Sequence, residues 1–296
     1  MPEAARPTWT RLFLDEEMSG PRCFPIAGGQ AAVYSASRPD ADLPNEDAAG
    51  LVTTGPRGGV FMVADGVGGS RGGRQAAHRV LELLARQLEP TRSDEGSRRT
   101  AILDGIESAN RRLLEAGTGG ATTLALVEVD GDKVRSYHVG DSAVLLLGQR
   151  GRLKLQTIDH SIAGYGLEAG MLDEDEALHH EDRHVVLNVV GSTEMRIEVG
   201  ATLRLAPRDT LILASDGLMD NLRVEEIVSL LRRGRLSTAS RALVDQARAR
   251  MAMPGNRGPS KPDDLTVVVF RRYGLGDLPP SPPRKGDEGT PGEEPR

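Results

Sequence analysis

The stretch from residue 61 to residue 77 limits the possible folds more than any other part of this chain. The apolar run Val60–Ala64 is typical of a buried strand, and it ends at Asp65. Gly66 and four further glycines follow within eight residues, and a helical apolar pattern begins after them. Because glycine lets another group approach the main chain closely, a carboxylate at this point suits a hard cation or a phosphate. An ordinary strand–turn–helix link would also fit these residues.

The same pattern of an apolar run beside an aspartate recurs three times. One run leads into Asp141 and another into Asp216, while Asp263 and Asp264 precede a third. Carboxylates that met in one place would repel one another and raise their own pKa values, and a bound cation would remove that cost. No Cys/His ligand spacing accompanies the aspartates. The ions should therefore prefer oxygen ligands, as magnesium and manganese do.

Seven motifs in a fixed order resemble the bacterial form of the metal-dependent protein phosphatases, the family called PPM or PP2C. They are Asn45–Ala48, Val63–Gly69, Gly120–Leu124, His138–Ser142, Asp159–Ser161, Leu213–Gly217 and Asp263–Val267. The resemblance extends from about residue 28 to residue 272. One motif alone would be a weak signal, but seven in order are specific.

The resemblance implies a fold and a set of metal-site residues. The fold is α+β, a four-layer α-β-β-α sandwich of two mainly antiparallel sheets flanked by helix pairs. The centre would hold two or three ions, Mn²⁺ or Mg²⁺, with Glu46 supporting the ligands from behind. The implied metal residues are Asp47, Asp65, Gly66, Asp141, Asp216 and Asp264.

The implied activity is hydrolysis of phosphoserine and phosphothreonine in proteins, with Asp65, Asp216 and Asp264 as the catalytic residues. Two cations lower the pKa of a bridging water, and the resulting hydroxide attacks phosphorus while the ions offset charge on the phosphoryl oxygens. The implied partners are phosphorylated protein substrates, with a Ser/Thr kinase acting in opposition.

Two positions depart from the family pattern. Many members have an arginine four residues before the glutamate of the Glu-Asp pair, and this chain has Asp42 there. Arg38 is then the candidate for gripping the substrate phosphate. Ser70 and Val67 stand where bacterial and eukaryotic members, respectively, often have histidine, so no general acid is assigned.

Two alternative functions also have some support in the sequence. Residues 127–134 fit the D-x-D signature of haloacid-dehalogenase-like phosphatases, but Asp130 and Asp132 flank a glycine as in a hairpin turn, and the helix this chemistry needs is missing. The other alternative is a catalytically weak, phosphatase-like module that regulates or binds phosphoproteins. The presence of every metal aspartate argues against that alternative.

The composition excludes several other classes. The chain has 296 residues, of which 38% are hydrophobic and 27% charged, which is ordinary for a globular protein. A net charge of −6 argues against nucleic acid as a partner. No apolar run approaches the length of a membrane span, and the start of the chain lacks a signal pattern. The single cysteine, Cys23, fits a reducing compartment. We therefore expect a cytoplasmic protein with no membrane partner.

The expected organisation is one phosphatase domain at residues 28–275, an N-terminal extension at 1–27 and a disordered tail at 276–296. Apolar side chains of the extension (Trp9, Leu12, Phe13 and Leu14) should cover the domain's own surface. Alternating segments from 123 to 157 predict a meander of adjacent antiparallel strands. A mobile flap is expected at 161–183, followed by a strand at 184–190.

Overall fold

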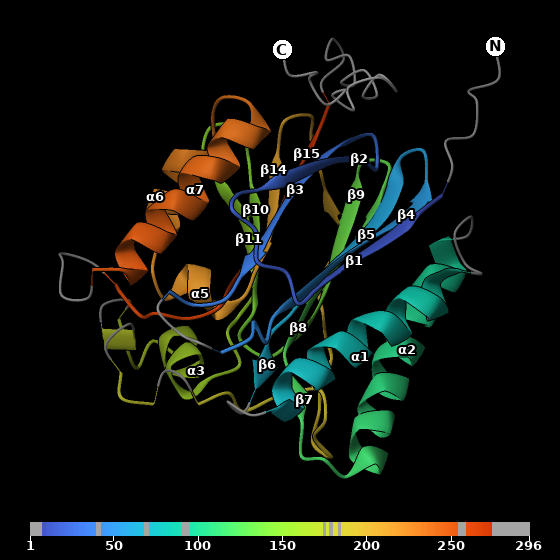
Figure 1. Cartoon of the computed structure of the whole chain (residues 1–296). Helices are drawn as coiled ribbons and strands as arrows, with labels where there is room; N and C mark the ends of the chain where they lie inside the picture. The colour runs from blue at the N-terminus through green and yellow to red at the C-terminus, as the bar shows by residue number, and fades with distance from the viewer. Residues whose placement is uncertain are drawn as a thin grey trace, which may run out of the picture.

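The computed structural model describes residues 8–39, 43–67, 71–89, 95–173, 176–177, 180–182, 185–253 and 259–273. Asp42, Ser70 and the expected tail lie outside these residues. Two antiparallel sheets pack face to face, and a pair of helices covers the outer face of each (Figure 1). The predicted four-layer α-β-β-α sandwich is confirmed.

The first sheet has the strand order β1-β4-β5-β8-β9-β12, with β13 also paired to β9. These strands are β1 (Thr10–Leu14), β4 (Ala48–Gly55), β5 (Gly58–Ala64), β8 (Leu124–Asp130), β9 (Lys133–Val139), β12 (Glu198–Val199) and β13 (Leu203–Arg204). Helices α1 (Arg71–Leu88) and α2 (Glu95–Ala116) cover its outer face. The apolar stripes of both helices, which include Leu81, Leu84 and Ile106, are buried there.

The second sheet has the order β11-β10-β14-β15-β3-β2. Its strands are β2 (Arg22–Ile26), β3 (Gly29–Ala36), β10 (Ala143–Leu147), β11 (Leu153–Gln156), β14 (Thr210–Ala214) and β15 (Leu265–Arg272). Helices α6 (Val224–Leu231) and α7 (Leu236–Met251) lie on its outer face (Figure 1).

The main core lies between the two sheets. Phe61 of β5 and Phe270 of β15 are fully buried, with ring centroids 4.8 Å apart. Every residue of β5 and β14 is buried, because each strand has packed neighbours on both of its faces. These two strands end at Asp65 and just before Asp216, so the rigid centre of the sandwich positions both aspartates.

The segment that the sequence assigned to an extension supplies an edge strand to each sheet. β1 pairs with β4 in the first sheet, and β2 pairs with β3 in the second. Phe13 is fully buried, and Trp9 packs against the same core. These apolar side chains therefore cover the domain's own surface, as expected.

The predicted meander is correct for β8 and β9 but wrong at the next link. β9 belongs to the first sheet, whereas β10 pairs with β14 in the second. The link at Gly140 crosses between the sheets, with a φ of 104° that favours glycine. The crossing places Asp141 at the end of the sandwich between the two sheets.

The strand expected at 184–190 is not formed in the described residues. Val186 and Val190 make only isolated bridges, to Ser161 and Thr122. Between them, the side chain of Asn188 bonds both the N–H and the C=O of Arg196, so it folds the chain back on itself. Part of the expected flap forms α3 (Ile162–Glu168).

The described helices include none that combines the length and the apolar character needed to cross a membrane.

Candidate metal centre

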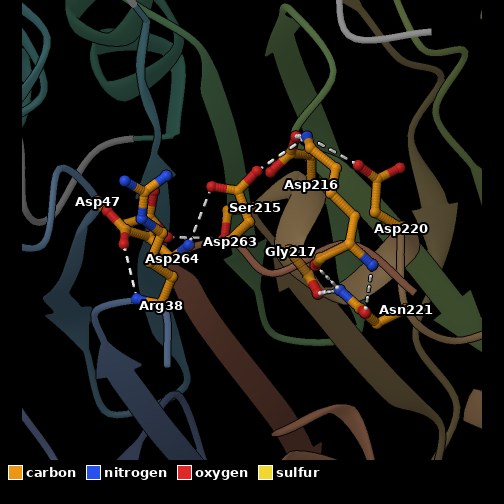
Figure 2. Close-up of polar contacts among 10 residues, drawn as sticks. Arg38, Asp47, Ser215, Asp216, Gly217, Asp220, Asn221, Asp263 and Asp264 are labelled. Carbon is orange, nitrogen blue, oxygen red and sulfur yellow. Dashed lines mark hydrogen bonds and ion pairs between the residues drawn. The ribbon is translucent and has the colours of Figure 1, made fainter. Parts of the chain in front are cut away.

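Antiparallel pairing brings the aspartates to one end of the sandwich. Ala48 lies opposite Ala64, which sets Asp47 beside Asp65. In the second sheet Ala214 lies opposite Val267, which sets the start of the short helix α5 (Asp216–Met219) beside the residues before β15. The start of one strand and the end of its neighbour always meet in such a pair. Figure 2 shows several of these side chains together.

The carboxylates affect one another's protonation. Burial raises the pKa of Asp65, and the charges of Asp47, Asp216 and Asp141 raise it further. Burial likewise raises the pKa of Asp47, and the charge of Asp264 raises it further. Mutual repulsion of this kind requires the groups to be close. The aspartates predicted from four separate motifs therefore form one cluster.

The charge of Asp159 raises the pKa of Asp141, so Asp159 adjoins this cluster. Three carboxylate oxygens here have no hydrogen-bond partner among the described residues: Oδ1 of Asp47, of Asp141 and of Asp159. A buried polar oxygen without a partner is costly. Ser215 donates to the other oxygen of Asp47 over 2.7 Å, which leaves Oδ1 free. The donor set is made of carboxylates, so it fits an oxygen-preferring divalent cation.

Close contacts between main-chain segments near Asp65 leave no room for a side chain, so these positions require glycine. A Cβ on Gly66 would lie 2.4 Å from the carbonyl carbon of Gly73 at the start of α1. A Cβ on Gly120 would lie 2.4 Å from the Gly72 oxygen. The helix start thus packs directly against β6 (Gly66–Val67) and the strand β7 (Ala121–Thr122) paired with it.

The structure separates the two adjacent aspartates before β15. The oxygens of Asp264 accept the backbone N–H groups of Arg38 (2.8 Å) and Glu46 (2.7 Å). Asp263 instead shares the Lys261 ammonium with Asp216, at 2.8 Å and 2.9 Å respectively, and its charge also raises the pKa of Asp65. The sequence prediction used Asp264 as the ligand, but the orientation of the two carboxylates favours Asp263.

Sequence reasoning missed Lys261 and Asp220. The Lys261 ammonium lies 2.9 Å from Asp216, 2.9 Å from Asp220 and 2.8 Å from Asp263. Burial alone would lower the pKa of Lys261, but the three carboxylates together raise it, so the ammonium stays charged. The spacing of Asp216 and Asp220, one helical turn apart, was the available signal.

A second polar cluster holds the Asp141 loop. The N–H groups of Gly140 (3.1 Å) and of the Asn188 amide (2.9 Å) both donate to Nδ1 of His160. Nε2 of His160 therefore bears the proton and donates to Glu198 over 3.0 Å. His138, His160 and Glu198 lie within ligand distance of one another. His160 nevertheless has no free lone pair, so this cluster positions the loop instead of binding a metal.

Arg38 and Glu46 lie at the rim of the cluster. Burial raises the pKa of Glu46, the charge of Asp264 adds to this, and the charge of Arg38 acts in the opposite direction. The Arg38 guanidinium is therefore close to Glu46 and is exposed to solvent. Asp42, the departure from the family pattern, lies outside the described residues.

The hairpin between β8 and β9 contains the two aspartates of the D-x-D signature. Asp130 ends β8 and Asp132 lies in the turn, where Gly131 has a φ of 59°. The two carboxylates stand at the end of an antiparallel pair with no following helix. A haloacid-dehalogenase-like function is excluded, because that chemistry needs its nucleophilic aspartate at the end of a parallel strand.

Comparisons with known proteins identify the family of this chain. The family model for protein phosphatase 2C matches residues 36–251. The serine/threonine phosphatase stp of Listeria welshimeri is 27% identical over 245 residues, which cover 77% of this chain and 90% of that protein. The serine/threonine phosphatase of S. agalactiae has a structure that superposes with a TM-score of 0.71 at 26% identity, covering 82% of this chain and 99% of that one.

A further structure contains metal. It is the catalytic domain of the serine/threonine protein phosphatase PstP in complex with two manganese ions, similar at a TM-score of 0.65 and 22% identity, covering 82% of this chain and 98% of that one.

The sandwich and its aspartate cluster define a metal-dependent phosphatase. Because the family model matches well over half of its length, the chain belongs to the protein phosphatase 2C family. Its activity is that of a protein serine/threonine phosphatase.

Proposed function

We propose that this chain hydrolyses phosphoserine and phosphothreonine esters with Mn²⁺ or Mg²⁺ held by its aspartate cluster. The unpartnered oxygens of Asp47 and Asp141 are the main support, because a bound cation, or a water molecule held by it, would satisfy them. Bound divalent cations supply an activated water and offset charge on the phosphoryl oxygens. Two manganese ions in PstP make manganese the first cation to test.

The proposed ligands come from both sheets. Asp65 and the Gly66 carbonyl would hold the central ions together with Asp216 and Asp263, the last in place of the Asp264 first expected. Asp47 would act mainly through bound water, oriented by Ser215. A third ion would use Asp141 together with Asp216, on the loop fixed by His160.

Arg38 is the proposed grip for the substrate phosphate. Its backbone is anchored on Asp264, while its guanidinium is exposed near Glu46 at the rim. The proposed substrates are phosphorylated proteins, with a Ser/Thr kinase acting in opposition. The proposed compartment is the cytoplasm, where the free Cys23 would remain reduced.

Hydrolysis of p-nitrophenyl phosphate and of a phosphothreonine peptide, with added manganese or with EDTA, tests the proposal. Turnover should need manganese and should be lost in Asp216→Asn. Asp245→Asn is the matched control, because Asp245 lies on the exposed side of α7, 63% of its side chain is accessible, and the charge change is the same. Absence of turnover in a protein that still binds manganese would instead favour the regulatory alternative.

A further inference from the structure

The ammonium of Lys261 lies at the point where three carboxylates converge. Its Nζ is 2.9 Å from Oδ2 of Asp216, 2.9 Å from Oδ2 of Asp220 and 2.8 Å from Oδ2 of Asp263. The three aspartates are labelled in Figure 2. Two of these partners, Asp216 and Asp263, are proposed metal ligands. The third, Asp220, is outside the proposed ligand set. A lysine has three donor hydrogens, so this arrangement can use all of them.

The main chain of Lys261 is fixed in place. The Asn221 side chain accepts the Lys261 N–H over 3.0 Å and donates to its carbonyl over 2.8 Å. The same amide donates to the Gly217 carbonyl on α5, and Asn221 is fully buried. The side chain of Lys261 therefore starts from a fixed point beside Asp216, and 27% of it is exposed to solvent.

We propose that Lys261 is a built-in cation that competes with one divalent ion for Asp216 and Asp263 and thereby weakens the binding of that ion. The inference rests on the proposed metal-dependent function. The ammonium and the divalent ion would both use the carboxylates of Asp216 and Asp263, and the two cations repel each other at this short range, so each weakens the binding of the other. When the divalent ion binds, the ammonium withdraws to Asp220, which remains available as its partner.

Manganese titration calorimetry on the metal-free protein measures the effect directly. Lys261→Met keeps the length of the side chain and removes the charge, so the affinity for the weakest manganese ion should rise roughly tenfold or more. Without metal, the melting temperature of this variant should fall, because three carboxylates lose their counter-charge. Added manganese should then raise it by more than in the unmodified protein.

Lys154→Met is the matched control. Lys154 also pairs with a carboxylate, that of Asp209, but the pair lies at β11 and the turn before β14, outside the cluster. The variant makes the same change in net charge, and its manganese affinity should equal that of the unmodified protein. A tenfold gain in both variants would show a general charge effect and overturn the proposal.

A double-variant cycle tests the role of Asp220. Asp220→Asn alone should weaken manganese binding several-fold, because the displaced ammonium loses its alternative partner. In the Lys261→Met background the same change should have little effect. Equal effects in both backgrounds would show that Asp220 does not act through Lys261.

Different results would overturn the competition by Lys261 and the proposed metal centre. Manganese binding that is unchanged or weaker in Lys261→Met would overturn the competition, while the metal-dependent phosphatase would stand. Failure of both the unmodified protein and Lys261→Met to bind manganese would overturn the proposed metal centre itself, and the competition with it.

Discussion

Asp263 and Asp264 are consecutive in the chain, but their carboxylates have different partners. Asp263 contacts the Lys261 ammonium over 2.8 Å within the aspartate cluster, whereas Asp264 accepts the N–H groups of Arg38 and Glu46. The first is placed to bind a cation. The second ties the loop before β4 to the start of β15, and so brings Arg38 to the rim.

Replacing each aspartate by asparagine should therefore give different results. Asp263→Asn should lower manganese affinity by more than about 100-fold, beyond the 10- to 100-fold typical of outer partners of a metal site. Asp264→Asn should change that affinity by less than about tenfold, because the amide oxygen still accepts one backbone bond. Calorimetry and Mn-dependent turnover check both variants. The reverse order of effects would restore the ligand assignment to Asp264.

Much of the fold and most of the cluster could be predicted from the sequence, because both depend on local pattern. The strands that end at Asp65 and before Asp216 are apolar runs with clear ends, and antiparallel pairing then brings their ends together. The sequence pattern does not show that the chain crosses to the other sheet at Gly140, because the packing of distant strands determines which sheet β10 joins. Lys261 was missed for a similar reason: two of its three partners, Asp216 and Asp220, are brought to it by α5 and its end.

The choice between Asp263 and Asp264 shows a further limit of sequence reasoning. Both residues precede β15, and a motif places them only to within one position. Which carboxylate faces the cluster depends on the two N–H groups that hold Asp264, and these come from the loop before β4. Such a contact, across more than 200 residues, leaves no pattern in a single sequence.

Gly66→Ala should reduce stability and activity together. The added Cβ would lie 2.4 Å from the carbonyl carbon of Gly73, so α1 must shift away from β6. Overpacking of this kind costs about 1–3 kcal/mol. Thermal unfolding and Mn-dependent turnover measure the effect. In Gly148→Ala the nearest atom, the far end of the Lys154 side chain, is 3.3 Å away, and this control should change neither quantity.

The stability of the metal-free protein should fall as pH rises. Burial, with smaller effects of Asp220 and Asp216, raises the pKa of Asp159 from 3.8 to about 7. A group whose pKa is higher in the folded state stabilises the fold below its unfolded value, and this stability is lost as pH rises through the folded value. The melting temperature in EDTA should therefore drop by a few degrees or more (on the order of 2–4 °C per kcal/mol) between pH 5 and pH 8.

Asp159→Asn should reduce that slope without abolishing it, because burial also raises the pKa of Asp65 and of Asp141. With manganese present the trend should reverse, since metal ligands must lose their protons to bind. Scanning calorimetry at several pH values, with EDTA or with manganese, checks both statements. A melting temperature in EDTA that rises with pH and is unaffected by Asp159→Asn would contradict the protonation assigned to this cluster.

Asn221→Ala should weaken manganese binding as well as the fold. Its side chain joins the Gly217 carbonyl on α5 to both backbone groups of Lys261, and its removal leaves these buried groups unpaired. The expected loss of stability is about 1–3 kcal/mol. Because the loop that contains Asp263 then loses its anchor, manganese affinity should also fall by about 10- to 100-fold, as for other outer partners of a metal site.

Asn110→Ala separates these two effects. Asn110 on α2 makes comparable bonds, accepting the Gly191 N–H over 2.6 Å and donating to the Ser192 carbonyl over 3.0 Å, but none of its partners belongs to the cluster. The Asn110→Ala variant should be less stable to denaturant unfolding, but its manganese affinity, measured by calorimetry, should be unchanged. If Asn221→Ala also kept its full manganese affinity, the amide would act only as a structural bond, and the position of Asp263 would have to be set by β15 alone.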